Sequence, residues 1–187
     1  MNIIIFGPPG AGKGTQAKHL VKKLESYQIS TGDMLRDEIE KDTYIGKKII
    51  NNMNDGKFVD DEIVNKLLEK IIFDENKINK LIFDGYPRTI NQAKNLDLLL
   101  KKSNQKIDFV FFLNVNKDSI LKRIERRKVL EKRSDDDDMT ILKRYDTYMK
   151  VTRPVLDYYS KNKNFHEIDG SMEIVKISQK IEEILKV

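Results

Sequence analysis

The sequence predicts an α/β protein in three layers, with a central five-stranded parallel sheet covered by helices on both faces. Two observations support this prediction. Short apolar segments alternate with helical patterns along the 187 residues, and the first segment runs directly into a glycine-rich turn followed by a helix. Strands that alternate with helices imply right-handed crossovers and therefore parallel strands. Such a sheet binds ligands at the carboxyl ends of its strands, where this turn lies.

Each predicted strand is a short apolar run, as expected of a strand that is buried on both faces. The five runs are residues 2–6, 28–29, 81–83, 109–115 and 165–168. The clearest helical stripes, with apolar residues three and four apart, span residues 17–24, 63–72 and 174–184. A chain of 187 residues suits one α/β domain with its own core, so we expect a single domain over residues 1–187.

The glycine-rich turn, Gly-Pro-Pro-Gly-Ala-Gly-Lys-Gly-Thr at residues 7–15, completes the pattern Gly-x-x-x-x-Gly-Lys between a strand and a helix. This is the context of a phosphate-binding loop, or P-loop. Its glycines let N–H groups approach an anion closely, and the helix adds its positive dipole end. Lys13 supplies a charge for the outer phosphates. The chain is therefore predicted to bind a nucleoside triphosphate in a P-loop NTPase fold.

One detail of this loop departs from the general pattern. Gly14 follows Lys13 where Ser or Thr is common, and the hydroxyl comes one residue later at Thr15. The order Gly-Lys-Gly-Thr indicates a particular branch of the P-loop proteins.

Composition excludes several kinds of protein. Cysteine is absent, which excludes disulfides and thiolate zinc sites. No apolar run approaches the ~20 residues of a membrane span, and the N-terminus enters a strand without a secretory signal; we expect a cytoplasmic protein with no membrane partner. The net charge of +5 comes from scattered lysines without an aromatic-studded basic stripe. We therefore expect no nucleic-acid partner.

Two further motifs follow predicted strands: Ser-Thr-Gly-Asp-Met-Leu-Arg at residues 30–36 and Phe-Asp-Gly-Tyr-Pro-Arg-Thr-Ile-Asn-Gln at residues 83–92. Asp84 ends an apolar strand beside the P-loop, where a carboxylate can hold the water shell of a magnesium ion. Asp33 is a weaker candidate, because an aspartate after a glycine can simply cap a helix.

Arginines dominate the remaining motifs. Arg36 and Arg88 follow different strands and can converge on one phosphate with planar, bidentate guanidinium groups. Residues 123–127 read Arg-Ile-Glu-Arg-Arg, and Arg133 and Arg144 follow. Together with Gly-Lys-Gly-Thr, these motifs closely resemble those of the adenylate kinase family. Four motifs match in order and spacing, and the resemblance covers essentially the whole chain.

The resemblance implies a nucleoside monophosphate kinase that converts ATP and AMP reversibly into two ADP with Mg²⁺, a monomer that serves adenine nucleotide homeostasis. It also implies a role for each matching residue. The ATP site would comprise Gly10, Ala11, Gly12, Lys13, Gly14, Thr15, Arg127 and the backbone near Met172. The AMP site would comprise Thr31, Arg36, Lys57, Phe58, Val59, Gly85, Tyr86, Pro87, Arg88 and Gln92, together with Arg133 and Arg144. The catalytic cations would be Lys13, Arg88, Arg123, Arg127, Arg133 and Arg144.

No direct protein ligand to magnesium is expected. The ion would be held by nucleotide phosphates and water, with Asp84 bound to that water and Asp33 and Thr15 as further candidates. Residues 30–59 would form a helical monophosphate-binding segment, and residues 127–137 a short lid without zinc. Both would move as insertions in the P-loop core, because an open site would transfer phosphate to water.

Two other functions stay open. Related pyrimidine monophosphate kinases tend to have asparagines in place of Thr89 and Gln92, so these residues favour AMP over UMP or CMP. A P-loop switch without transferase activity has no need for a second phosphate site, and the arginines argue against it. Tyr145, Tyr148, Tyr158 and Tyr159 lie at helical spacing and are expected to pack in the core.

Overall fold

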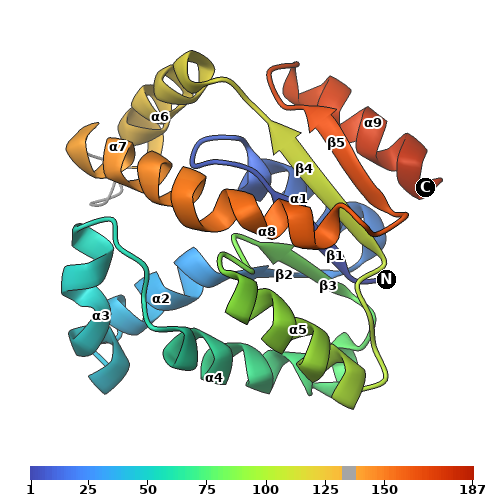
Figure 1. Ribbon diagram of the computed structural model, residues 1–187, viewed down its shortest axis with the longest axis horizontal. Coiled ribbons are helices and arrows are strands. Elements are labelled where there is room, and N and C mark those ends of the chain that lie inside the picture. The colour runs from blue at the N-terminus through green and yellow to red at the C-terminus, as the bar shows by residue number, and fades with distance from the viewer. Residues whose placement is uncertain (132–137) are drawn as a thin grey trace.

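The computed structural model describes residues 1–131 and 138–187 (Figure 1). Its centre is a five-stranded, all-parallel sheet in the order β2-β3-β1-β4-β5. The strands are β1 (Ile3–Phe6), β2 (Tyr27–Ser30), β3 (Leu81–Asp84), β4 (Phe109–Asn114) and β5 (Phe165–Asp169). The parallel sheet and its five strands confirm the prediction, including the second strand, which only the short segment Gln28-Ile29 had indicated.

Helices cover both faces of this sheet, as Figure 1 shows. They are α1 (Lys13–Leu24), α2 (Thr31–Glu40), α3 (Tyr44–Asn54), α4 (Asp61–Ile72), α5 (Ile90–Lys102), α6 (Lys117–Glu131), α7 (Asp138–Thr147), α8 (Arg153–Tyr159) and α9 (Ile174–Leu185). A short 3₁₀ turn, η1 (Glu75–Lys77), precedes β3. Among the described helices, none is long and apolar enough to cross a lipid bilayer.

Successive residues of the central strand β1 enter different cores. Ile4 and Phe6 point to the face covered by α4, α5 and α8, whereas Ile3 and Ile5 point to the face covered by α1, α6 and α9. All four side chains are almost completely buried. Because both faces are covered, the strand is apolar throughout and does not alternate with polar residues.

The order of the strands places the P-loop, which follows β1, next to the loop that follows β3. β1 pairs with β3 on one side and β4 on the other, with Ile5 opposite Asp84. The loop after β1 and the loop after β3 therefore leave the same edge of the sheet side by side. This is the crevice at which open α/β sheets bind ligands.

One long helical stretch runs across this edge. In Figure 1, α7 and α8 form a nearly continuous orange helix. A single π-helical turn, η2 (Tyr148–Thr152), joins them, and Pro154 lies in the first turn of α8. A π turn has one residue more per hydrogen-bonded ring than an α turn, so it changes which side chains face the sheet.

Candidate active site

The P-loop wraps the beginning of α1. Gly12 precedes the helix with φ 93°, in the left-handed region that glycine adopts without strain. The Ala11 N–H donates to the Pro8 carbonyl at 3.1 Å, which closes the turn. The Lys13 ammonium donates to the carbonyl oxygens of Gly7 and Pro8, at 2.8 and 3.0 Å. The only positive charge that the P-loop itself carries is thus folded over the loop.

A cavity of about 90 Å³ lies beside this loop, which is the volume of about three water molecules at ~30 Å³ each. Its walls come from the P-loop, the segment after β2, the loop after β3 and the α7–α8 stretch. Five cationic side chains line it, and no aspartate or glutamate is among the described residues of its wall. The five cations are Lys13, Arg36, Lys57, Arg88 and Arg144. A wall of this kind is built for an anion of several charges.

One carbonyl oxygen joins the two motifs that follow β2 and β3. The Gly85 carbonyl accepts from the Thr31 hydroxyl at 2.9 Å and from Arg88 Nε at 2.7 Å. The Arg88 guanidinium also lies over the Phe58 ring, 5.4 Å from its centroid. These contacts orient the Arg88 guanidinium, which reduces the entropy lost when it binds a ligand.

Arg36 is oriented from its own helix. Its Nη2 donates to Asp33 Oδ1 at 2.5 Å, one turn earlier on α2. Asp33 does not cap that helix; Ser30 does, with its hydroxyl oxygen accepting from the Asp33 N–H at 3.3 Å. The structure therefore gives Asp33 a partner in Arg36, and its expected link to magnesium stays a prediction.

Asp84 lies at the end of β3, against the first turn of α1. Its Oδ2 accepts from the Gln28 amide, on the neighbouring strand, at 3.0 Å. A Cβ atom placed on Gly14 would lie 3.2 Å from the same oxygen. Asp84 is thus held by one neighbour and closely approached by the P-loop helix.

The comparisons with known proteins agree with this geometry. A family model described as "Adenylate kinase" matches residues 5–164. The chain belongs to the adenylate kinase family. Curated relatives named adenylate kinase are similar over the whole chain: that of Pelagibacter ubique is 48% identical over 213 aligned positions and covered completely, as is this chain. Those of Bartonella henselae and Caulobacter sp. are each 40% identical, with 100% of this chain and 100% and 99% of the relative covered.

Lengths differ among these adenylate kinases. The Pelagibacter alignment has more positions than the 187 residues of this chain, so that relative carries residues with no counterpart here. The Caulobacter alignment has 187 positions. The expected short lid falls largely on residues 132–137, outside the part of the chain that the structure describes.

The structure brings part of the expected site together in one cavity. Nine of the residues that the resemblance to adenylate kinases implies line its wall: Lys13, Arg36, Lys57, Phe58, Val59, Gly85, Pro87, Arg88 and Arg144. Arg123 on α6 reaches the P-loop instead, with Nη1 3.4 Å from the Ala11 carbonyl. Arg133 and the Arg127 side chain lie outside the described residues. Thr15 is exposed at the first turn of α1.

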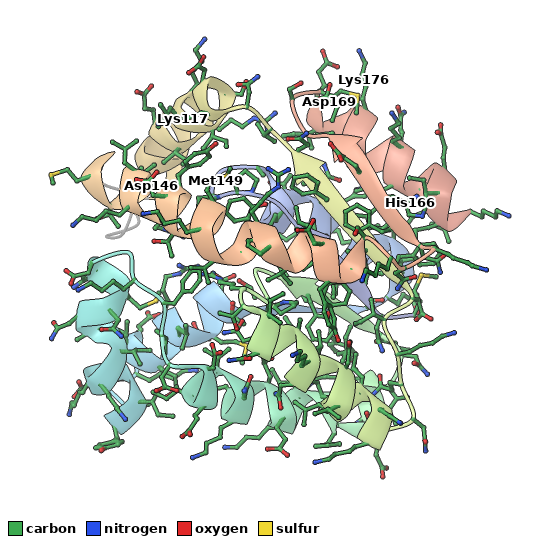
Figure 2. All side chains as sticks on the ribbon, in the orientation of Figure 1. Lys117, Asp146, Met149, His166, Asp169 and Lys176 are labelled. Carbon is green, nitrogen blue, oxygen red and sulfur yellow. The ribbon has the colours of Figure 1, made fainter. Side chains whose placement is uncertain are left out.

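Met172 lies away from that cavity. Its side chain packs against the core formed by α1, α6 and α9. Figure 2 labels Asp169 and Lys176 on either side of the turn that carries it. The predicted contact of its backbone with the adenine of ATP is not tested by this arrangement.

Gln92 and Tyr86 are bound inside the protein. The Gln92 amide oxygen accepts from the Arg88 N–H at 2.7 Å, and its nitrogen donates to Asp61 Oδ1 at 2.6 Å. Each end of an amide can make two hydrogen bonds, so both retain capacity for an adenine edge. The Tyr86 side chain is buried, its hydroxyl donates to Asn65 Oδ1 at 2.9 Å, and burial raises the pKa of that phenol. Any contact of Tyr86 with AMP would come from its backbone.

Sequence reasoning missed Asp61. Its carboxylate lies at the start of α4 and accepts from the Thr89 hydroxyl at 3.0 Å as well as from the Gln92 amide. An acidic group that binds the amide nitrogen fixes which way the Gln92 amide faces. The sequence does hold a signal, because Asp60-Asp61-Glu62 opens a helical stripe, but a helix N-terminus alone explains such residues.

The segment after β2 also touches α7. The Thr140 hydroxyl donates to the Asn54 carbonyl at 3.3 Å. Gly56, with φ 67°, lies so close that a Cβ atom there would be 3.0 Å from Thr140 and 3.1 Å from Arg144. The cavity is thereby closed on the side of α3, and Arg144 is brought against the segment that carries Arg36 and Lys57.

Proposed function

We propose that this chain transfers the terminal phosphoryl group of ATP to AMP and so forms two ADP, reversibly. The observation that carries the proposal is the cavity wall with five cations and no described carboxylate. Such a wall, beside a complete P-loop, suits two phosphate chains that meet end to end. Membership of the adenylate kinase family supports the same reaction.

The two nucleotides would use different walls. ATP would lie with its phosphates along residues 10–15, with Arg127 and the backbone near Met172 at its far end. AMP would bind between residues 57–59 and 85–88, with its phosphate near Arg36 and Arg88 and its base near Gln92. Thr31, whose hydroxyl supports the Gly85 carbonyl, would shape this second site from behind.

The chemistry needs no general base from the protein. The attacking atom is a phosphate oxygen that is already anionic at neutral pH, so catalysis depends on reducing charge repulsion and on in-line alignment. Lys13 would turn from the P-loop carbonyls to the outer phosphates of ATP. Arg88, Arg123, Arg127, Arg133 and Arg144 would surround the group in transit, where negative charge must be stabilised.

The residues near the P-loop suit magnesium held through water. Mg²⁺ keeps several waters and binds proteins through one or two carboxylates together with substrate phosphates. Asp84 offers such a carboxylate, orientated by Gln28 at Oδ2, and Thr15 offers a hydroxyl on the same turn. When bound, the ion would neutralise negative charge on the nucleotide phosphates. Among the described residues, no group of three acidic or histidine side chains forms a metal site by itself.

Residues 30–59 and 127–137 would be the moving parts of a single domain. Residues of the first segment supply much of the cavity wall and touch α7 at Gly56. A nucleotide would then enter when this contact opens. We propose a cytoplasmic monomer that balances the adenine nucleotides, with ATP, ADP and AMP as its partners.

A coupled assay with ATP and a panel of monophosphates tests the proposal. We expect rapid, magnesium-dependent formation of ADP with AMP, and much slower turnover with UMP and CMP. Two adenosines joined through five phosphates should inhibit tightly, because that molecule spans both sites. Faster turnover with UMP or CMP would make the chain a pyrimidine nucleotide kinase. ATP binding without transfer to any monophosphate would indicate a switch.

A further inference from the structure

A buried tyrosine that lines this cavity has a hydroxyl without a hydrogen-bond partner. Among the described residues, the hydroxyls of Tyr148 and Tyr159 and the amide nitrogen of Asn95 are the buried side-chain polar atoms that lack one. Burying an unpaired hydroxyl is costly, by ~1–3 kcal/mol. An exception of this kind in a native protein calls for a reason.

Tyr148 and Tyr159 differ in their surroundings. The Tyr159 ring packs in the core 5.7 Å from the Phe6 ring, on the wall that faces α5. Asp97, whose carboxylate accepts from Tyr158 at 2.7 Å, is also among the groups that raise the pKa of Tyr159. Tyr148 instead lines the cavity together with Lys13, Arg88 and Arg144.

The π-helical turn places Tyr148 in that wall. Tyr148 begins the turn and Thr152 ends it, and both line the cavity. The neighbouring residues Asp146 and Met149 are exposed, and Figure 2 labels both on this helical stretch. A π turn often marks a functional position, because it alters the side-chain register of a helix. Here it turns one tyrosine inward within an exposed helical surface.

The chemistry of the phenol suits an anion. Burial raises the pKa of the Tyr148 hydroxyl, with Arg153 opposing and Tyr145 adding to the shift, so the group keeps its proton at neutral pH. A protonated phenol can donate one hydrogen bond. The charged groups around it in the cavity are cations, which can only donate as well, and no protein acceptor makes a hydrogen bond with the hydroxyl. The missing partner is therefore an acceptor that the protein does not supply.

We propose that the Tyr148 hydroxyl donates a hydrogen bond to the phosphate of the bound nucleoside monophosphate. This inference rests on the proposed function for the identity of the ligand. The phosphate would be held by arginines and, from the α7–α8 stretch, by a neutral donor. Tyr148 is thus proposed as a substrate-binding residue. Its expected packing is confirmed, because the side chain is buried, and the proposal adds a ligand for its hydroxyl.

The test compares Tyr148→Phe with the matched control Tyr159→Phe. Each change removes one buried hydroxyl from the same helical stretch, and of the two tyrosines only Tyr148 lines the cavity. Tyr148→Phe should lower kcat/KM for AMP at least tenfold while KM for ATP stays within twofold of wild type. Tyr159→Phe should leave both constants within twofold. Tyr148→Phe should not lower the melting temperature of the nucleotide-free protein, because it removes no protein hydrogen bond.

Deoxynucleotides distinguish a hydrogen bond to the phosphate of AMP from a hydrogen bond to its ribose. The tenfold penalty of Tyr148→Phe should persist with 2′-deoxyAMP and 3′-deoxyAMP. A penalty that disappears with either one would place the hydroxyl on the ribose and overturn the assignment.

Calorimetric titration with AMP keeps this inference separate from the proposed function, because it measures affinity without requiring turnover. Wild-type protein that forms no ADP would overturn the function, and the titration would still compare the two variants. Equal AMP affinity in wild type and Tyr148→Phe would overturn the inference. A melting temperature several degrees lower in Tyr148→Phe would do the same, since it would reveal a partner inside the protein.

Discussion

The Asp84 carboxylate lies where a side chain on Gly14 would have to go. A Cβ atom on Gly14 would be 3.2 Å from Asp84 Oδ2, closer than ordinary van der Waals contact. The Gln28 amide also donates to that oxygen at 3.0 Å, so a displacement of the carboxylate would disturb this hydrogen bond. This packing accounts for the glycine that follows Lys13, where P-loops more often have Ser or Thr.

We expect Gly14→Ala to impair the handling of magnesium. The added methyl group would displace Asp84 by a few tenths of an ångström, and misplacement by ~1 Å can cost a hundredfold in rate. Activity should fall about tenfold at limiting Mg²⁺ and recover in part at high Mg²⁺. A magnesium titration at fixed ATP and AMP measures this.

A double-mutant cycle identifies the cause. With Asp84→Ala in the background, Gly14→Ala should have little further effect, because the colliding group is gone. An undiminished penalty in that background would mean that the methyl group disturbs something other than Asp84.

Lys13→Ala should nearly abolish turnover and leave the fold intact. The ammonium donates to two P-loop carbonyls, and Lys13 is not part of either apolar core. Lys18→Ala is the matched control, because Lys18 is exposed on the same helix. A Lys13→Ala protein that keeps more than about a tenth of the wild-type rate would limit the contribution of the ammonium to ~1.4 kcal/mol, too little for the proposed role.

Asp61 should affect AMP through Gln92. Gln92→Ala should raise KM for AMP more than KM for ATP, since only the AMP site is proposed to contain it. Asp61→Ala removes the acceptor that orients the Gln92 amide. It should therefore also raise KM for AMP more than KM for ATP, by a factor that corresponds to about 1–2 kcal/mol. Steady-state kinetics with each nucleotide varied in turn measures both effects.

The double variant Asp61→Ala/Gln92→Ala decides whether Asp61 acts through Gln92. If it does, the two penalties should not add, because the second change removes a residue that is already misplaced. Full additivity would show that Asp61 acts on the site by another route, and equal rises in both KM values would mean that Gln92 is structural.

Arg144 should act on the rate and not on stability. Its side chain lines the cavity and lies against Gly56. Arg144→Ala should cut kcat at least a hundredfold, or ~2.7 kcal/mol, with little change in melting temperature. Lys143→Ala, at the exposed neighbouring position, should change neither kcat nor the melting temperature. Arg133→Ala is expected to behave like Arg144→Ala. Near-normal kcat in both arginine variants would remove them from the mechanism.

The local parts of this protein could be predicted from sequence because they depend on neighbouring residues. Strand β1 and the P-loop follow from an apolar run joined to Gly-x-x-x-x-Gly-Lys. Helices α4 and α9 follow from apolar residues three and four apart. The motif arginines Arg36 and Arg88 both line one cavity, as expected of residues that follow adjacent parallel strands.

Only the tertiary structure decided which distant side chains meet. Gln28 binds Asp84 from 56 residues away, and Asp61 binds Gln92 from 31 residues away. Such pairs depend on strand register and helix packing, which residue spacing along one segment does not contain. Tyr148 shows the same limit within a single helix. Regular spacing assumes 3.6 residues per turn, and the π turn at Tyr148–Thr152 breaks that assumption, so a tyrosine expected only to pack also lines the cavity.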